Sequence, residues 1–165
     1  EYGFLLGSAA FGAAVGMGID ALTSSISIDY FVLGKGVAAG PGLGGRIALL
    51  GARAGTSAGV IAAAVLLIAN PVPRDALRMW RCVPLVLLGA LVGGAGLGLI
   101  QVGTGWPEIE SLRGVLPEDR ARHFESVWAL HLGIYGGAIL GLIVATLRWR
   151  RRYTPADGAD GIESR

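Results

Sequence analysis

The chain has 165 residues, of which 53% are hydrophobic, and a net charge of only +2. This composition predicts one membrane domain over residues 1–152 and no separate soluble domain. Its basic residues do not alternate with aromatic residues along a stripe, which argues against nucleic acid as a partner. The single cysteine, Cys82, excludes an internal disulfide bond and has no metal-ligand spacing around it.

Four apolar stretches cover residues 3–22, 47–69, 83–100 and 127–147. A hydrocarbon core about 30 Å thick is crossed by about 20 helical residues, and each stretch has about that length. We therefore expect an all-α, polytopic membrane protein with a four-helix transmembrane bundle. Residues 153–165 are polar, and we expect them to form a disordered cytoplasmic tail.

The first apolar stretch is not preceded by basic residues, so we expect a retained helix and not a signal peptide. In the loop after it, Ser25–Tyr30 alternates polar and apolar residues in a strand-like way. An isolated strand would have no sheet to join. We therefore expect an interfacial segment with Tyr30 and Phe31 at the level of the lipid headgroups.

The same loop contains Gly40-Pro41-Gly42-Leu43-Gly44-Gly45, which formally matches a dinucleotide-binding fingerprint. No buried strand precedes it and the expected helix after it is transmembrane, so we do not expect a nucleotide site. A lipid phosphate near the start of the second helix remains an open alternative.

The loop before the fourth helix contains Leu116-Pro117-Glu118-Asp119. Proline in the first turn and acidic residues at the positive end of the helix dipole are typical of a helix start. We therefore expect the fourth helix to extend outward from Pro117, with Glu118 and Arg122 spaced for a surface ion pair.

Arginines gather in two places that predict the orientation. Arg74, Arg78 and Arg81 lie between the second and third helices, and Arg148-Trp149-Arg150-Arg151-Arg152 follows the fourth. By the positive-inside rule both regions are cytoplasmic. We expect a multi-pass protein of the inner (plasma) membrane, with both termini cytoplasmic.

Glycines recur at four-residue spacing in all four stretches. In lipid, helices associate through small residues that let their backbones approach closely. We expect packing faces formed by Gly12, Gly16, Gly51, Gly55, Gly59, Gly89, Gly93, Gly133, Gly137 and Gly141.

Four polar residues are expected at membrane depth, in the outer half of the bundle: Asp20, Arg53, Gln101 and His131. Ionisable residues inside a membrane are costly and are candidates for function. Three interpretations remain open. In the first, each residue is satisfied separately. In the second, Asp20 and Arg53 form an ion pair. In the third, the cluster binds a ligand, proton or ion.

The sequence gives little support for a catalytic site or a metal site. His123 and His131 are the only histidines, and both lie on the fourth helix. Pairing Glu125 with His123 would give two ligands on an exposed turn. We identify no serine in a nucleophile motif. We expect no enzymatic activity, no bound metal and no cofactor.

Ser27-Ile28-Asp29-Tyr30-Phe31, followed by Gly34-Lys35-Gly36, resembles the first outer loop of uncharacterised four-helix bacterial membrane proteins, which often have a Ser-Pro-Glu-Tyr-Phe-like motif there. His131 and Tyr135, within Trp128–Gly137, resemble a His-plus-Tyr pattern in their last helix. Ile28 replaces the proline and Asp29 the glutamate. The resemblance implies a fold and no activity.

We expect a small non-catalytic integral membrane protein, an accessory or structural subunit of a larger bacterial membrane complex. Its expected partners are the lipid bilayer and other membrane subunits or copies of itself. The alternative is a small transporter or channel with its polar site in the outer half of the bundle.

Overall fold

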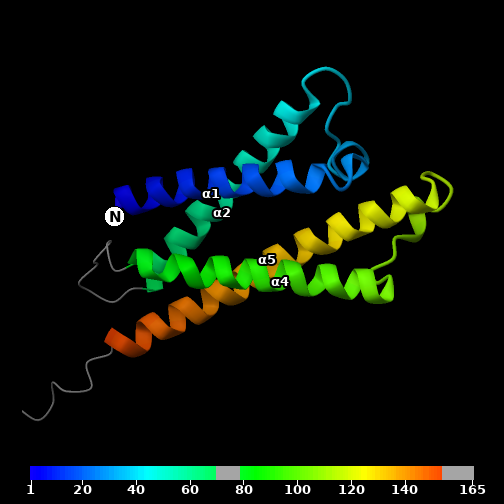
Figure 1. The fold of residues 1–165 in the computed structure, drawn as a ribbon. Coiled ribbons are helices and arrows are strands. Elements are labelled where there is room, and N and C mark those ends of the chain that lie inside the picture. The colour runs from blue at the N-terminus through cyan, green and yellow to red at the C-terminus, as the bar shows by residue number, and fades with distance from the viewer. Residues whose placement is uncertain (70–78, 154–165) are drawn as a thin grey trace, which may run out of the picture.

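The computed structural model describes residues 1–69 and 79–153 (Figure 1). Four long helices dominate it: α1 (Tyr2–Ser24), α2 (Leu43–Ala69), α4 (Val83–Thr104) and α5 (Glu118–Tyr153). Three short helical turns precede α2, α4 and α5, respectively: η1 (Tyr30–Gly34), η2 (Trp80–Cys82) and η3 (Glu110–Leu112). Within these ranges the chain has no strand, only one isolated bridge between Arg113 and Leu116.

The four long helices are each long and apolar enough to cross a membrane, which confirms the all-helical prediction and its four apolar helices. α2 begins four residues earlier than predicted. α5 begins directly after Pro117, as predicted, and the Ala121 amide donates to the Pro117 carbonyl 2.9 Å away. Tyr153, the first residue of the predicted tail, is the last residue of α5, whereas residues 154–165, Arg74 and Arg78 lie outside the described residues.

The helices form two antiparallel hairpins, α1 with α2 and α4 with α5, and each pair crosses as an X (Figure 1). The two hairpins meet mainly where α5 contacts α2 and η1. The start of α1, the start of α4 and the end of α5 lie toward one end of the molecule.

Glycines line the crossing in each hairpin. A Cβ atom on Gly55 would overlap the carbonyl oxygen of Gly12, and one on Gly137 would overlap that of Gly89. These backbones are therefore too close for any side chain between them. The other predicted packing glycines lie at the same two crossings: Gly16, Gly51 and Gly59 in the first hairpin, and Gly93, Gly133 and Gly141 in the second.

Two apolar clusters join the hairpins, one toward each end. We call them the Trp149 cluster (Phe4, Ala63, Leu66, Leu67, Met79, Cys82, Ala145 and Trp149) and the Tyr30 cluster (Tyr30, Phe31, Ile47, Leu112, Phe124 and Val127). In the first, the rings of Phe4 and Trp80 meet edge to face at 5.2 Å. The second lies beside the polar groups described next.

Candidate functional site

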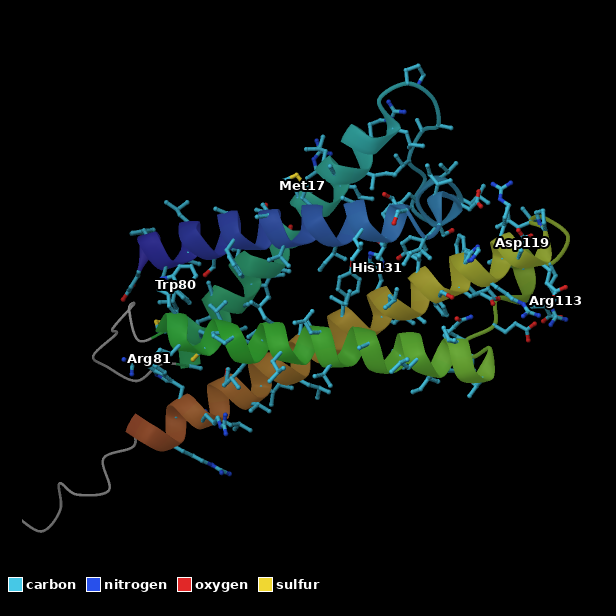
Figure 2. All side chains as sticks on the ribbon, viewed as in Figure 1. Met17, Trp80, Arg81, Arg113, Asp119 and His131 are labelled. Carbon is cyan, nitrogen blue, oxygen red and sulfur yellow. The ribbon has the colours of Figure 1, made fainter. Side chains whose placement is uncertain are left out.

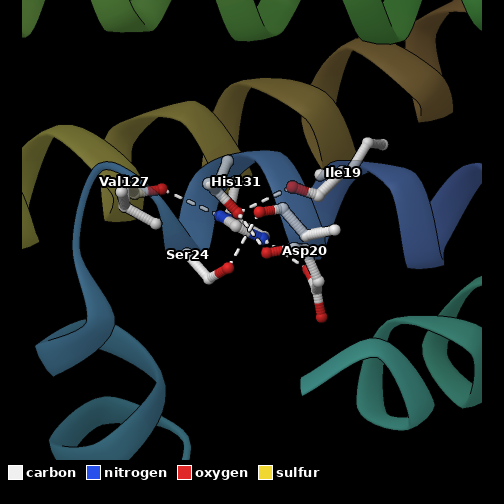
Figure 3. Close-up of polar contacts among 7 residues, drawn as sticks. Ile19, Asp20, Ser24, Val127 and His131 are labelled. Carbon is white, nitrogen blue, oxygen red and sulfur yellow. Dashed lines mark hydrogen bonds and ion pairs between the residues drawn. The ribbon is translucent and has the colours of Figure 1, made fainter. Parts of the chain in front are cut away.

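A buried pair of polar side chains bridges the two hairpins. His131 Nε2 on α5 lies 3.0 Å from Asp20 Oδ1 on α1, although the two residues are 111 positions apart (Figure 3). Only 2% of His131 and 8% of Asp20 is exposed. Buried groups of this kind are costly unless they are hydrogen-bonded, and here each supplies the other's partner.

The glycine crossings place both side chains. Asp20 follows Gly16 by four residues, so it continues the face of α1 that packs on α2, and a Cβ on Gly51 would lie 2.9 Å from the Asp20 Cβ. His131 precedes Gly133 by two residues, which is about 200° around the helix. The glycine face of α5 therefore packs on α4 while His131 points toward the first hairpin.

The hydrogen bonds of the imidazole define where its protons lie. Nδ1 is 2.9 Å from the carbonyl oxygen of Val127, which can only accept, so Nδ1 carries a proton and donates it. The contact between Nε2 and Asp20 needs a second proton. The pair is therefore an imidazolium beside a carboxylate, or an imidazole beside a carboxylic acid.

Aromatic rings enclose this pair. The Tyr30 ring stacks on the imidazole with centroids 4.9 Å apart, and the rings of Phe31 and Tyr135 approach it edge-on at 6.2 and 6.0 Å. Burial, followed by Tyr135 and Asp20, raises the pKa of Tyr30 well above its ordinary value. The Tyr30 phenol therefore stays neutral and protonated against the imidazole.

Tyr30 and Phe31 are buried against protein side chains, while their depth at the level of the lipid headgroups stays a prediction. They are 3% and 0% exposed. The rings of Tyr30 and Phe31 pack with Phe124, Val127 and His131 on α5. Both residues belong to the π-helical turn η1, which ends with the Lys35 amide donating to the Tyr30 carbonyl. In the sequence, the aromatic residues of this apolar loop and the His131–Tyr135 pattern of the fourth helix were the signal that could have revealed the burial of Tyr30 and Phe31.

The four predicted polar residues do not form one cluster. Asp20 and His131 meet, whereas Gln101 accepts a hydrogen bond from Ser126 at 2.6 Å and ties α4 to α5. Arg53 is exposed on α2, and its guanidinium has no hydrogen-bond or ion-pair partner among the described residues. The pairing considered between Asp20 and Arg53 is replaced by the pairing of Asp20 with His131.

Other polar residues at the same end of the molecule as the Asp20–His131 pair form hydrogen bonds and ion pairs with one another. Asp29 receives two hydrogen bonds from Arg120, at 2.8 and 2.5 Å, beside a cavity of about 260 Å³ that His123 also lines. Glu118 pairs with Arg122 as predicted. No group of three or more His, Cys, Asp or Glu in residues 1–69 and 79–153 could hold a metal ion.

Glu125 was considered only as a surface ligand, but it is buried and its Oε1 accepts the Ile109 amide proton at 2.8 Å. We expect Glu125→Ala to speed hydrogen exchange at the Ile109 amide about tenfold, because an amide that bonds a carboxylate loses about 1.5 kcal/mol or more with it. Glu125→Gln keeps an acceptor oxygen and should change this rate little. Equal rates in both variants would show that this bond does not hold the loop.

The chain matches no protein-family model, no curated protein and no solved structure.

Proposed function

We propose that this protein is a non-catalytic integral membrane subunit, a polytopic four-helix bundle that packs into a larger membrane complex of the bacterial inner membrane. Its partner is a membrane-spanning helix that places a carboxylate against Arg53. The observation that carries this proposal is that the exposed guanidinium of Arg53, on a helix long and apolar enough to cross a membrane, has no partner among the described residues.

The depth of Arg53 follows from α2, which runs from Leu43 to Ala69 over 27 residues. At about 1.5 Å per residue, a core about 30 Å thick centred on this helix begins near Ile47 and contains Arg53 about 10 Å inside its boundary. An isolated arginine near the bilayer centre costs about 2.5–3.5 kcal/mol on insertion scales. A carboxylate on a neighbouring helix offsets this cost through a charge-assisted, bidentate pair.

The surroundings of Arg53 suit a packed helix. It lies about 200° around α2 from the glycine face that packs on α1, so a partner can reach it without separating the hairpin. Small residues flank it on the exposed surface of α2, namely Ala54, Ser57 and Ala58. Such residues admit close approach of another backbone.

The distribution of charge supports cytoplasmic termini. Arg81 and the exposed Arg148 and Arg151 belong to the end of the molecule where α4 starts and α5 finishes, whereas toward the opposite end Arg113 is accompanied by acidic residues such as Asp119 (Figure 2). By the positive-inside rule the arginine-rich end faces the cytoplasm. The Asp20–His131 pair then lies in the outer half of the bundle.

The test is affinity purification of the tagged protein from native membranes in mild detergent, comparing wild type with Arg53→Gln, Arg53→Lys and Arg122→Gln. We expect wild type and Arg122→Gln to retain the same membrane protein at fixed stoichiometry. Arg53→Gln should retain at least tenfold less, and Arg53→Lys should recover part of it because the positive charge remains. A wild-type protein that purifies alone, or a partner indifferent to Arg53→Gln, would overturn the proposal.

A second candidate, a small transporter or channel, is favoured by the buried Asp20–His131 pair, since paired ionisable residues in membranes also form ion and proton pathways. It requires that purified wild-type protein in vesicles carry a proton or ion flux and that Asp20→Asn abolish it. Absence of flux in the wild type would remove this candidate.

A further inference from the structure

We propose that Asp20 and His131 share one exchangeable proton, and that this proton fastens α1 and η1 of the first hairpin to α5. The inference does not rest on a partner protein. It follows from how many hydrogen bonds the imidazole makes and from where the pair lies between the hairpins.

The proton count is fixed by chemistry. A neutral imidazole has one N–H group, and here both ring nitrogens have oxygen partners, Val127 on one side and Asp20 on the other. Both bonds exist together only while the pair holds two protons, of which one lies between Nε2 and Oδ1. When that second proton leaves to bulk water, either tautomer of the neutral imidazole keeps one bond and loses the other.

Loss of the proton also leaves a charge behind. The protonated pair is neutral overall, whereas the deprotonated pair is an ionised carboxylate beside a neutral imidazole. Among the described residues, the titratable groups that face the imidazole are Asp20 from α1, Tyr30 from η1 and Tyr135 from α5 itself, and the cation Lys35 has its Nζ 5.5 Å from the Tyr30 ring centroid. A buried negative charge without a positive charge beside it is costly even when a neutral N–H group still donates to it, so the carboxylate should move toward water.

Movement of the Asp20 carboxylate should affect how the two hairpins pack, because the pair lies between them. Contact between the hairpins is concentrated at α5 with α2 and η1, and the pair adds a polar link from α1 to α5 (Figure 3). The Trp149 cluster joins the hairpins at the other end through packed apolar side chains. Deprotonation should therefore loosen the η1 end while the Trp149 end stays packed.

The experiment uses the whole chain in lipid nanodiscs, with His123→Gln as the background so that His131 gives the only imidazole signals. ¹⁵N NMR follows the imidazole nitrogens across pH, and hydrogen exchange follows the amides of Lys35 and Val37, which bond to Tyr30 and Phe31. Exchange rates are corrected for the intrinsic dependence on pH. We expect protection of both amides to fall about tenfold or more in the same step in which the imidazole loses its proton, since a bond between charged groups is lost.

Asp20→Asn supplies the matched variant. Its side-chain amide can donate to Nε2 of a neutral imidazole, so the contact persists without the shared proton. Protection at Lys35 and Val37 should then be independent of pH. A wild-type protein whose protection does not change with imidazole ionisation overturns the proposal by itself, and so does an Asp20→Asn protein that keeps the wild-type pH dependence.

Discussion

Gly137→Ala should lower the free energy of unfolding by about 1–3 kcal/mol, the usual cost of forcing an extra group into a closed contact. The new Cβ would overlap the Gly89 carbonyl oxygen, and because this neighbour is backbone, α4 and α5 must move apart. The measurement is reversible unfolding in mixed micelles, followed by circular dichroism.

The adjacent residue provides the control. A Cβ on Gly136 meets no atom within 4 Å, so Gly136→Ala should leave stability unchanged or raise it by up to about 1 kcal/mol through better helix propensity. The first hairpin repeats the comparison with Gly12→Ala, which overlaps Gly55, and Gly18→Ala, which meets nothing. If the clashing and open positions respond alike, close glycine contact does not hold the hairpins together.

Asp20→Ala should destabilise the protein by about 3–5 kcal/mol, the range found when one member of a buried pair is removed. The variant leaves His131 Nε2 without its partner in a site that is enclosed by Tyr30 and Phe31. The same mixed-micelle unfolding measures the change.

Asp20→Asn should be far less destabilising, because the amide still fills the site and donates to the imidazole. Glu118→Ala breaks an ion pair between two exposed side chains and should have little effect, since such pairs contribute little to stability. An Asp20→Ala protein as stable as Glu118→Ala would show that the buried pair is not a structural contact.

The helices could be predicted from sequence because length and apolarity decide whether a segment spans a membrane. Pro117 and the acidic residues after it likewise determine locally where α5 begins. The start of α2 was placed too late, at Ile47, because the glycines around Leu43 were assigned to the loop. In the structure, Arg46 holds this start by donating to the carbonyls of Ala38, Gly40 and Pro41.

The partner of Asp20 could not be predicted, and the reason is geometric. Arg53 and His131 each lie two residues from a packing glycine, so each points away from its own hairpin's contact. Which of these outward faces is covered depends on how the two hairpins pack on each other. That arrangement buries His131 and leaves Arg53 exposed, and no local pattern distinguishes the two.

The measurement that tests the proposed function most directly is photo-crosslinking in intact membranes, with a photoreactive amino acid replacing Ser57 on the exposed face of α2 beside Arg53. We predict one discrete adduct with another membrane protein or a second copy of this chain, lost when Arg53→Gln is added and restored in part by Arg53→Lys. Adducts with lipid alone, or a protein adduct that Arg53→Gln leaves unchanged, would contradict the proposal that a partner helix packs against Arg53.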